Sequence, residues 1–278
     1  MTQDFMDTAS GKNASTENFP VGSLLIRADL RPHIHVLYDF ARAADDVSDH
    51  PGLSPQEKVS KLEEFATTLL EDKSDAVPQA VALRKSLRQT NVSPQHSLDL
   101  LTAFKRDATQ QRYVDWFDLL DYCTFSAAPV GRHVLALHGI GKEAWSANDA
   151  LCDALQIINH IQDCADDYKK LNRVYIPQDM LTKYGARTED LALPKSSASL
   201  RATLNAMLDR LDPMMKEALL LPQHIPDWRL KTETAVIGAL ADRLIALLYK
   251  RDPLCDNVKL GKASIFCATL SGMLRAWL

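Results

Sequence analysis

Apolar positions recur with helical spacing along most of the chain, and prolines and glycines separate the segments. In residues 31–49 one apolar stripe consists of Leu37, Phe40, Ala41, Ala44 and Val47. The same pattern predicts further helices over residues 54–71, 76–90, 94–111, 115–138, 142–169, 196–221, 226–250 and 261–278. We expect a kink at Pro129, a break or kink at Pro213 and a loop over 184–194. No segment sustains period-two alternation, so the sequence predicts no strand.

The predicted fold class is therefore all-α. We expect a single helical domain over residues 16–278, preceded by a polar, disordered segment over residues 1–15. Of the 278 residues, 46% are hydrophobic, which is enough to bury a large core.

Charge and composition exclude some classes of function. The net charge is −4 and there is no basic patch, so we expect no nucleic-acid partner. The first residues contain no apolar signal segment, and the longest weakly polar run, 263–274, is shorter than the ~20 residues that span a bilayer. Five cysteines without metal spacing indicate a reduced, cytoplasmic protein. The last helix is apolar enough to line a lipid-sized pocket or touch the inner face of a membrane, although core packing is its default interpretation.

The most informative stretch is QIINHIQDCADDYKKLNRVYIP, residues 156–177. It places Asp163 and Asp167 four residues apart, on one helix face with Asn159 and Gln156. Two carboxylates this close repel each other unless a cation lies between them, and Mg²⁺ commonly joins one or two carboxylates to substrate phosphates. Because most acidic pairs on helices are merely solvated, this stretch alone is weak evidence for a metal.

A second acidic pair strengthens the interpretation. Residues 38–49 read YDFARAADDVSD, with Asp45 and Asp49 four apart and Arg42 one turn before Asp45. If the two helices face each other, the four aspartates would hold Mg²⁺ ions that bind a diphosphate. Arg42 and Arg173 would donate charge-assisted hydrogen bonds to its oxygens. An apolar, dry pocket would then protect a carbocation, so the residues predict a metal-dependent enzyme acting on a prenyl diphosphate.

Aromatic side chains are expected near this site, because aromatic faces stabilise cations. Most aromatics simply pack in cores, but four are expected to face the cation or line the pocket: Tyr38, Phe40, Tyr122 and Phe125. Phe19 is expected to contact the substrate. His160 lies off the aspartate face and is expected to pack in the core or behind the site.

Three blocks in this order resemble the squalene and phytoene synthase family: YDFARAADDVSD, YCTFSAAPVGR and QIINHIQDCADDYKKLNRVYIP. The resemblance runs from about Phe19 to Leu278 and implies an isoprenoid synthase helical bundle around a central apolar cavity. It implies Mg²⁺ on Asp45, Asp49, Asp163 and Asp167. It also implies contacts with substrate or diphosphate at Tyr38, Arg42, Tyr122, Gln156, Asn159 and Arg173.

Details within the family resemble one branch. Many members that condense two prenyl diphosphates carry Arg immediately before the second aspartate box, where this chain has Gln162. Asn18-Phe19-Pro20 and the Pro129-Val130-Gly131-Arg132 segment are similar to the hydroxysqualene synthases of bacterial hopanoid pathways. The resemblance implies conversion of presqualene diphosphate and water to hydroxysqualene and diphosphate. No reductase cofactor is expected, because the sequence offers no nucleotide-binding fold.

Two alternatives stay open. One is a condensing squalene or phytoene synthase that joins two prenyl diphosphates head to head. The other is a non-catalytic helical partner that presents lipid to other enzymes of the squalene pathway. Association with such enzymes and peripheral contact with the membrane are compatible with either interpretation.

Overall fold

The computed structural model describes residues 25–277, which fall into two compact units that meet in the sequence between Thr109 and Gln110. Within the described residues both units are helical, and the only β-type pairing is an isolated bridge between Arg112 and Val174. The all-α prediction is confirmed. The expected disorder of residues 1–15 and the expected substrate contact of Phe19 lie outside the described residues, and the single domain over 16–278 stays a prediction.

The first unit contains four helices: α1 (Arg31–Asp49), α2 (Pro55–Leu70), α3 (Pro78–Thr90) and α4 (Gln95–Thr109). Helix α1 packs against the other three. The Phe40 side chain is fully buried and meets Phe65 edge-on, with ring centroids 5.6 Å apart. Because an aromatic pair of this kind buries much apolar area, it anchors α1 to α2.

Polar groups fix both ends of α2. At the N-terminal end Ser54 and Glu57 form a capping box. Glu57 N donates to Ser54 Oγ, and Ser54 N donates to the Glu57 carboxylate. At the C-terminal end the buried guanidinium of Arg84 donates from Nη1 to the main-chain oxygens of Thr68, Glu71 and Ser74. Arg84 therefore holds the turn between α2 and α3.

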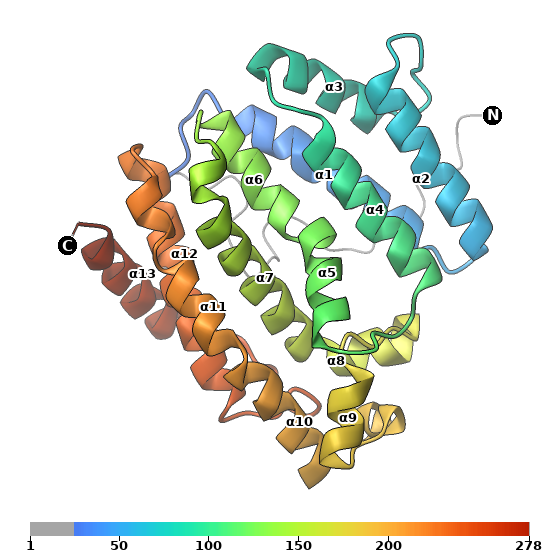
Figure 1. Cartoon of the computed structure of the whole chain (residues 1–278), viewed down its shortest axis with the longest axis vertical. Helices are drawn as coiled ribbons and strands as arrows, with labels where there is room; N and C mark the ends of the chain where they lie inside the picture. Colours follow the sequence, from blue (N-terminus) through green and yellow to red (C-terminus); the bar gives the residue numbers. More distant parts are fainter. Residues whose placement is uncertain (1–24, 278) are drawn as a thin grey trace. The chain divides into compact units, whose positions relative to one another are not determined.

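The second unit is built around α7 (Trp145–Gln162), which packs against α5 (Trp116–Ser126), α6 (Ala128–Leu137), α11 (Leu211–Ala218) and α12 (Trp228–Leu248). Short segments follow α7: α8 (Cys164–Asp166), a π-helical turn (Asp167–Leu171) and α9 (Gln178–Tyr184). Helices α10 (Ala198–Asp209) and α13 (Lys262–Trp277) complete it, together with 3₁₀ turns at Lys142–Ala144, Thr188–Ala192 and Leu221–His224. Figure 1 shows α13 running alongside α12.

The structure divides three of the predicted helices. The helix expected over 142–169 consists of a 3₁₀ turn, α7, the short α8 and the start of the π-helical turn. The helix expected over 115–138 breaks at Ala127, two residues before Pro129, and the helix expected over 196–221 breaks at Arg210, three residues before Pro213. Both prolines therefore lie in the first turn of a new helix, where the absent N–H costs no hydrogen bond. Helix α9 was not predicted, because it is only seven residues long.

None of the helices within residues 25–277 is both long enough and apolar enough to cross a bilayer.

Candidate functional site

The first aspartate box lies on α1 in the first unit. Arg42 donates from Nη1 to Asp45 Oδ2 at 3.0 Å and from Nη2 to Asp46 Oδ1 at 2.7 Å. Burial lowers the pKa of Arg42, but the negative charges of Asp45 and Asp46 outweigh it and raise the pKa above its usual value. The structure thus joins Arg42 to the box through helical i,i+3 and i,i+4 pairs.

The other predicted residues of α1 have different environments. Tyr38 and Asp49 are half-buried, and Ser48 Oγ donates to Asp49 Oδ1 at 3.3 Å. Phe40, by contrast, is enclosed in the core of the first unit against Phe65. Its packing explains why α1 carries an aromatic residue there, and its contact with substrate stays a prediction.

The second aspartate box lies where α7 ends. Helix α7 stops at Gln162, but the main chain stays helical in its hydrogen bonds: Asp163 N donates to Asn159 O at 2.9 Å, and Asp167 N donates to Asp163 O at 2.8 Å. Asn159, Asp163 and Asp167 are therefore one helical turn apart, as the sequence predicted. Gln156 and Asn159 are half-buried on α7, whereas Asp163 is exposed.

A π-helical turn follows at once and redirects the chain. It ends at Asn172, which adopts the left-handed conformation (φ 54°). Arg173 N then donates back to Asp167 O at 3.1 Å, and the Arg173 side chain is 6% exposed. Single π-helical turns are rare and frequently occur at functional sites. This turn places the main chain of Arg173 directly against the second box.

Arg112, which no sequence motif indicated, holds the π-helical turn. Its guanidinium donates to the Asn172 side chain at 2.8 Å and to the Asn172 main-chain oxygen, and it lies 5.8 Å from the centre of the Tyr168 ring. No local pattern indicated this role, because Arg112 and Asn172 are far apart in the sequence.

Four aromatic rings form a buried cluster next to the second box. Tyr122 lies 5.3 Å from Tyr113 and 5.4 Å from Tyr175, measured between ring centroids. His160 stacks on Tyr175 with centroids 3.6 Å apart and planes 15° apart. Burial, and secondarily the positive charge of Arg173, lowers the pKa of His160 to about 3. His160 is therefore a neutral member of the cluster, whereas Tyr113 was not singled out by the sequence.

Gln162 lies immediately before the second aspartate box, at the position where many condensing members of the family carry Arg. Its Nε2 donates to the main-chain oxygen of Val258 at 2.6 Å, in the segment that precedes α13. The side chain thus ties the end of α7 to that segment. The predicted pocket aromatic Phe125 is half-buried on α5.

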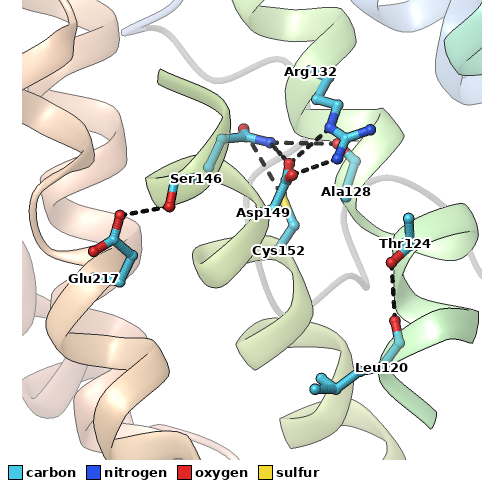
Figure 2. A network of polar contacts seen from close by, with 9 residues as sticks. Leu120, Thr124, Ala128, Arg132, Ser146, Asp149, Cys152 and Glu217 are labelled. Atoms are coloured by element: carbon cyan, nitrogen blue, oxygen red, sulfur yellow. Dashed lines mark hydrogen bonds and ion pairs between the residues drawn. The ribbon is translucent and has the colours of Figure 1, made fainter. Parts of the chain in front are cut away.

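Arg132, in the segment that carried part of the resemblance, belongs to a polar network between α6 and α7 (Figure 2). Arg132 Nε donates to Asp149 Oδ1 at 2.9 Å, and Nη2 pairs with Oδ2. The guanidinium also lies over the Trp145 ring, 4.5 Å from its centre. On the other side of α7, Ser146 Oγ donates to Glu217 on α11 at 2.8 Å. These contacts fix α7, and hence the second box at its end, between its neighbouring helices.

The aspartate carboxylates of the two boxes fit an Mg²⁺ ion that is also bound by a phosphate ligand. Within residues 25–277 no three His, Cys, Asp or Glu side chains converge into a closed metal cage. Mg²⁺ rarely needs one, because it keeps several waters and binds through one or two carboxylates plus substrate phosphates. Each box offers two carboxylates one helical turn apart, which matches that requirement.

Comparison with known proteins gives consistent results. The squalene/phytoene synthase family matches residues 12–264. The hydroxysqualene synthase of Rhodopseudomonas palustris is 43% identical over 95% of this chain and 90% of its own length. That of Sinorhizobium fredii is 40% identical over 92% of this chain and 88% of its own length. The solved squalene synthase of Alicyclobacillus acidocaldarius is 29% identical, covers 87% of this chain and 90% of its own, and superposes with a TM-score of 0.74.

Proposed function

Because this chain belongs to the squalene/phytoene synthase family, as its three motifs predicted, we propose that it catalyses the hydroxysqualene synthase reaction. The similarity to two curated hydroxysqualene synthases over more than nine tenths of the chain carries this conclusion. The substrate is presqualene diphosphate, and the products are hydroxysqualene and diphosphate.

In this proposal the carboxylates of Asp45, Asp49, Asp163 and Asp167 bind Mg²⁺. The bound ions would neutralise charge on the diphosphate and make it a better leaving group. The i,i+4 spacing that the backbone preserves from Asp163 to Asp167 supports this assignment.

Four further residues hold the substrate in this proposal: Arg42, Gln156, Asn159 and Arg173. The arginines donate charge-assisted hydrogen bonds to diphosphate oxygens as the carbon–oxygen bond breaks and negative charge moves onto the leaving group. The main-chain bond from Arg173 to Asp167, and the ion pairs of Arg42 within its box, support this role.

In this proposal aromatic residues protect the carbocation that is left when diphosphate departs. Tyr38, Tyr122 and Phe125 present aromatic faces to it and limit the entry of water to the one molecule that forms the new carbon–oxygen bond. The buried cluster of Tyr122 with Tyr113, Tyr175 and neutral His160 supports this role, because none of its own side chains carries a positive charge.

The test is an incubation with Mg²⁺ and no NADPH, with presqualene diphosphate in one tube and farnesyl diphosphate in another. Mass spectrometry should detect hydroxysqualene from the first tube only. A condensed product from the second tube would favour the squalene synthase activity named for the solved relative. No turnover in either tube would favour a non-catalytic lipid-presenting partner.

Two matched variants test the carboxylates. Asp163→Asn should lower kcat about 100-fold or more, because one oxygen ligand loses its charge. Asp166→Asn is the control, because the exposed Asp166 pairs with Lys170 in the same segment and should change kcat little. Equal activity of both variants would contradict the metal assignment.

We further propose that the enzyme works in contact with a membrane and with the enzymes that supply and consume these lipids, because its substrate and product are both long-chain isoprenoids.

A further inference from the structure

Helix α13 exposes an unusual number of large apolar side chains. Phe266 is 69% exposed, Leu270 51% and Leu274 58%, and Met273 lies beside them. These four residues follow the spacing i, i+4, i+7, i+8 and therefore form one continuous stripe, which we call the α13 stripe. A soluble surface rarely gathers such side chains on a single helix without a binding role.

The opposite face of α13 is fixed against α12. A Cβ added at Gly272 would lie 2.6 Å from Val236 Cα, so the two helices touch through their backbones at that point. Ala268 and Ala276, one turn to either side of Gly272, are buried. Figure 1 shows α13 lying alongside α12. Because α13 cannot rotate without losing its close contact with α12, the exposed side chains of the α13 stripe are held away from α12.

The charge around the stripe differs from that of the whole protein. Residues 249–278 contain five Lys or Arg and two Asp, a net charge of +3, while the chain as a whole carries −4. Residues 257–278 contain no acidic side chain. Lys259 and Lys262 are exposed at the N-terminal end of α13, and Arg275 near the other end pairs with Asp242.

We propose that the α13 stripe docks on the surface of an anionic lipid bilayer, with Phe266, Leu270 and Leu274 inserted at the headgroup boundary. An apolar helix face beside basic residues is the pattern of interfacial helices, and each basic residue adds attraction to anionic headgroups. Two copies of this segment would repel each other through their net positive charge, which disfavours self-association. The benefit of docking rests on the proposed function: the substrate would enter the enzyme directly from the bilayer, and the product would return to it.

Co-sedimentation with vesicles tests the docking without any substrate. The full chain should bind vesicles of about one part phosphatidylglycerol to two parts phosphatidylcholine, and bind pure phosphatidylcholine less. Phe266→Ser with Leu270→Ser should weaken binding about 10-fold or more, because two apolar side chains no longer enter the interface. Phe117→Ser is the matched control, since Phe117 is 75% exposed on α5, and should bind as the parent does.

A pair of tryptophan variants tests contact of the α13 stripe with lipid if the double variant fails to fold. Phe266→Trp is conservative, and its added emission should be quenched by vesicles that contain brominated lipid. Phe117→Trp should show no added quenching. Equal quenching of the two, or no quenching of either, would overturn the proposal.

Other outcomes would also overturn it. Unchanged vesicle binding by the folded double variant would show that the stripe does not touch lipid. A dimer in light scattering that the double variant converts to a monomer, without vesicle binding, would make the stripe a self-association surface. Activity on detergent-dispersed substrate should be unchanged in the double variant. If the parent also lacks that activity, the proposed function fails while the vesicle result still stands.

Discussion

A buried carboxyl group on α7 should make the stability of the protein depend on pH in an unusual direction. Asp153 Oδ1 is buried and has no hydrogen-bond partner among residues 25–277. Arg132, the nearest compensating cation, is already engaged by both oxygens of Asp149. Burial, and then the negative charge of Asp149, raises the pKa of Asp153 from 3.8 to about 7.

The direction of the effect follows from linkage. Asp153 holds its proton more tightly in the folded than in the unfolded protein, so its contribution to stability is complete below pH 3.8 and is lost as the pH rises through about 7. A shift of roughly three units corresponds to about 4 kcal/mol at pH 8. Since the side chain is partly exposed, we expect about 2–4 kcal/mol.

The substitution Asp153→Asn removes this titration. Urea unfolding of the parent and the variant, measured from about pH 4 to pH 8.5, gives the difference in unfolding free energy at each pH. The variant should gain stability over the parent as the pH rises, and most of the gain should appear between about pH 4 and 7. A difference that does not change with pH would refute the reasoning.

Asp149→Asn is the informative control. It removes the bidentate partner of Arg132 and the negative charge beside Asp153. The variant should be less stable than the parent, because the guanidinium loses its partner. It should also have a smaller pH dependence, because the pKa of Asp153 falls when Arg132 becomes available to it.

Two further substitutions each test the packing inside one of the units: Gly131→Ala in the second unit and Arg84→Ala in the first. Gly131→Ala should destabilise the second unit by about 1–3 kcal/mol in thermal or urea unfolding, because a Cβ there would overlap Asn148 Oδ1 and lie 2.6 Å from Cys152 Sγ. Unchanged stability would show that α6 and α7 separate easily. Arg84→Ala should cost about 2–4 kcal/mol, because three carbonyl oxygens at the end of α2 lose their donor, whereas Arg88→Ala on the same helix removes only an exposed ion pair and should cost less than about 1 kcal/mol. Equal losses for the two arginines would contradict the capping role of Arg84.

Local signals in the sequence were sufficient for most helices and for the family. The apolar stripe of 31–49 corresponds to α1, and Ser54 with Pro55 marked the start of α2, because capping and helical periodicity depend only on neighbouring residues. A kink at Pro129 and a break or kink at Pro213 were expected, and the structure has a break before each proline.

The second aspartate box shows the limit of such reasoning. Its i,i+4 spacing was readable because it is a property of one helix, and the backbone hydrogen bonds from Asn159 to Asp167 preserve it. The π-helical turn that follows was not readable, because Arg112 stabilises it from 60 residues away through Asn172. The burial of Phe40 against Phe65 was not readable either, because it depends on the packing of α1 on α2.

The sequence by itself therefore determined the helical class, the spacing within the two aspartate boxes and the family, since each is encoded in the spacing of residues along one helix or in short contiguous blocks. Only the tertiary structure decided that His160 stacks on Tyr175, that Asp153 shares its surroundings with the Arg132–Asp149 pair, and that the α13 stripe faces outward. These features depend on which helices meet and at what angle. That choice is made by the sum of many contacts between segments distant in the chain, and no local pattern records it.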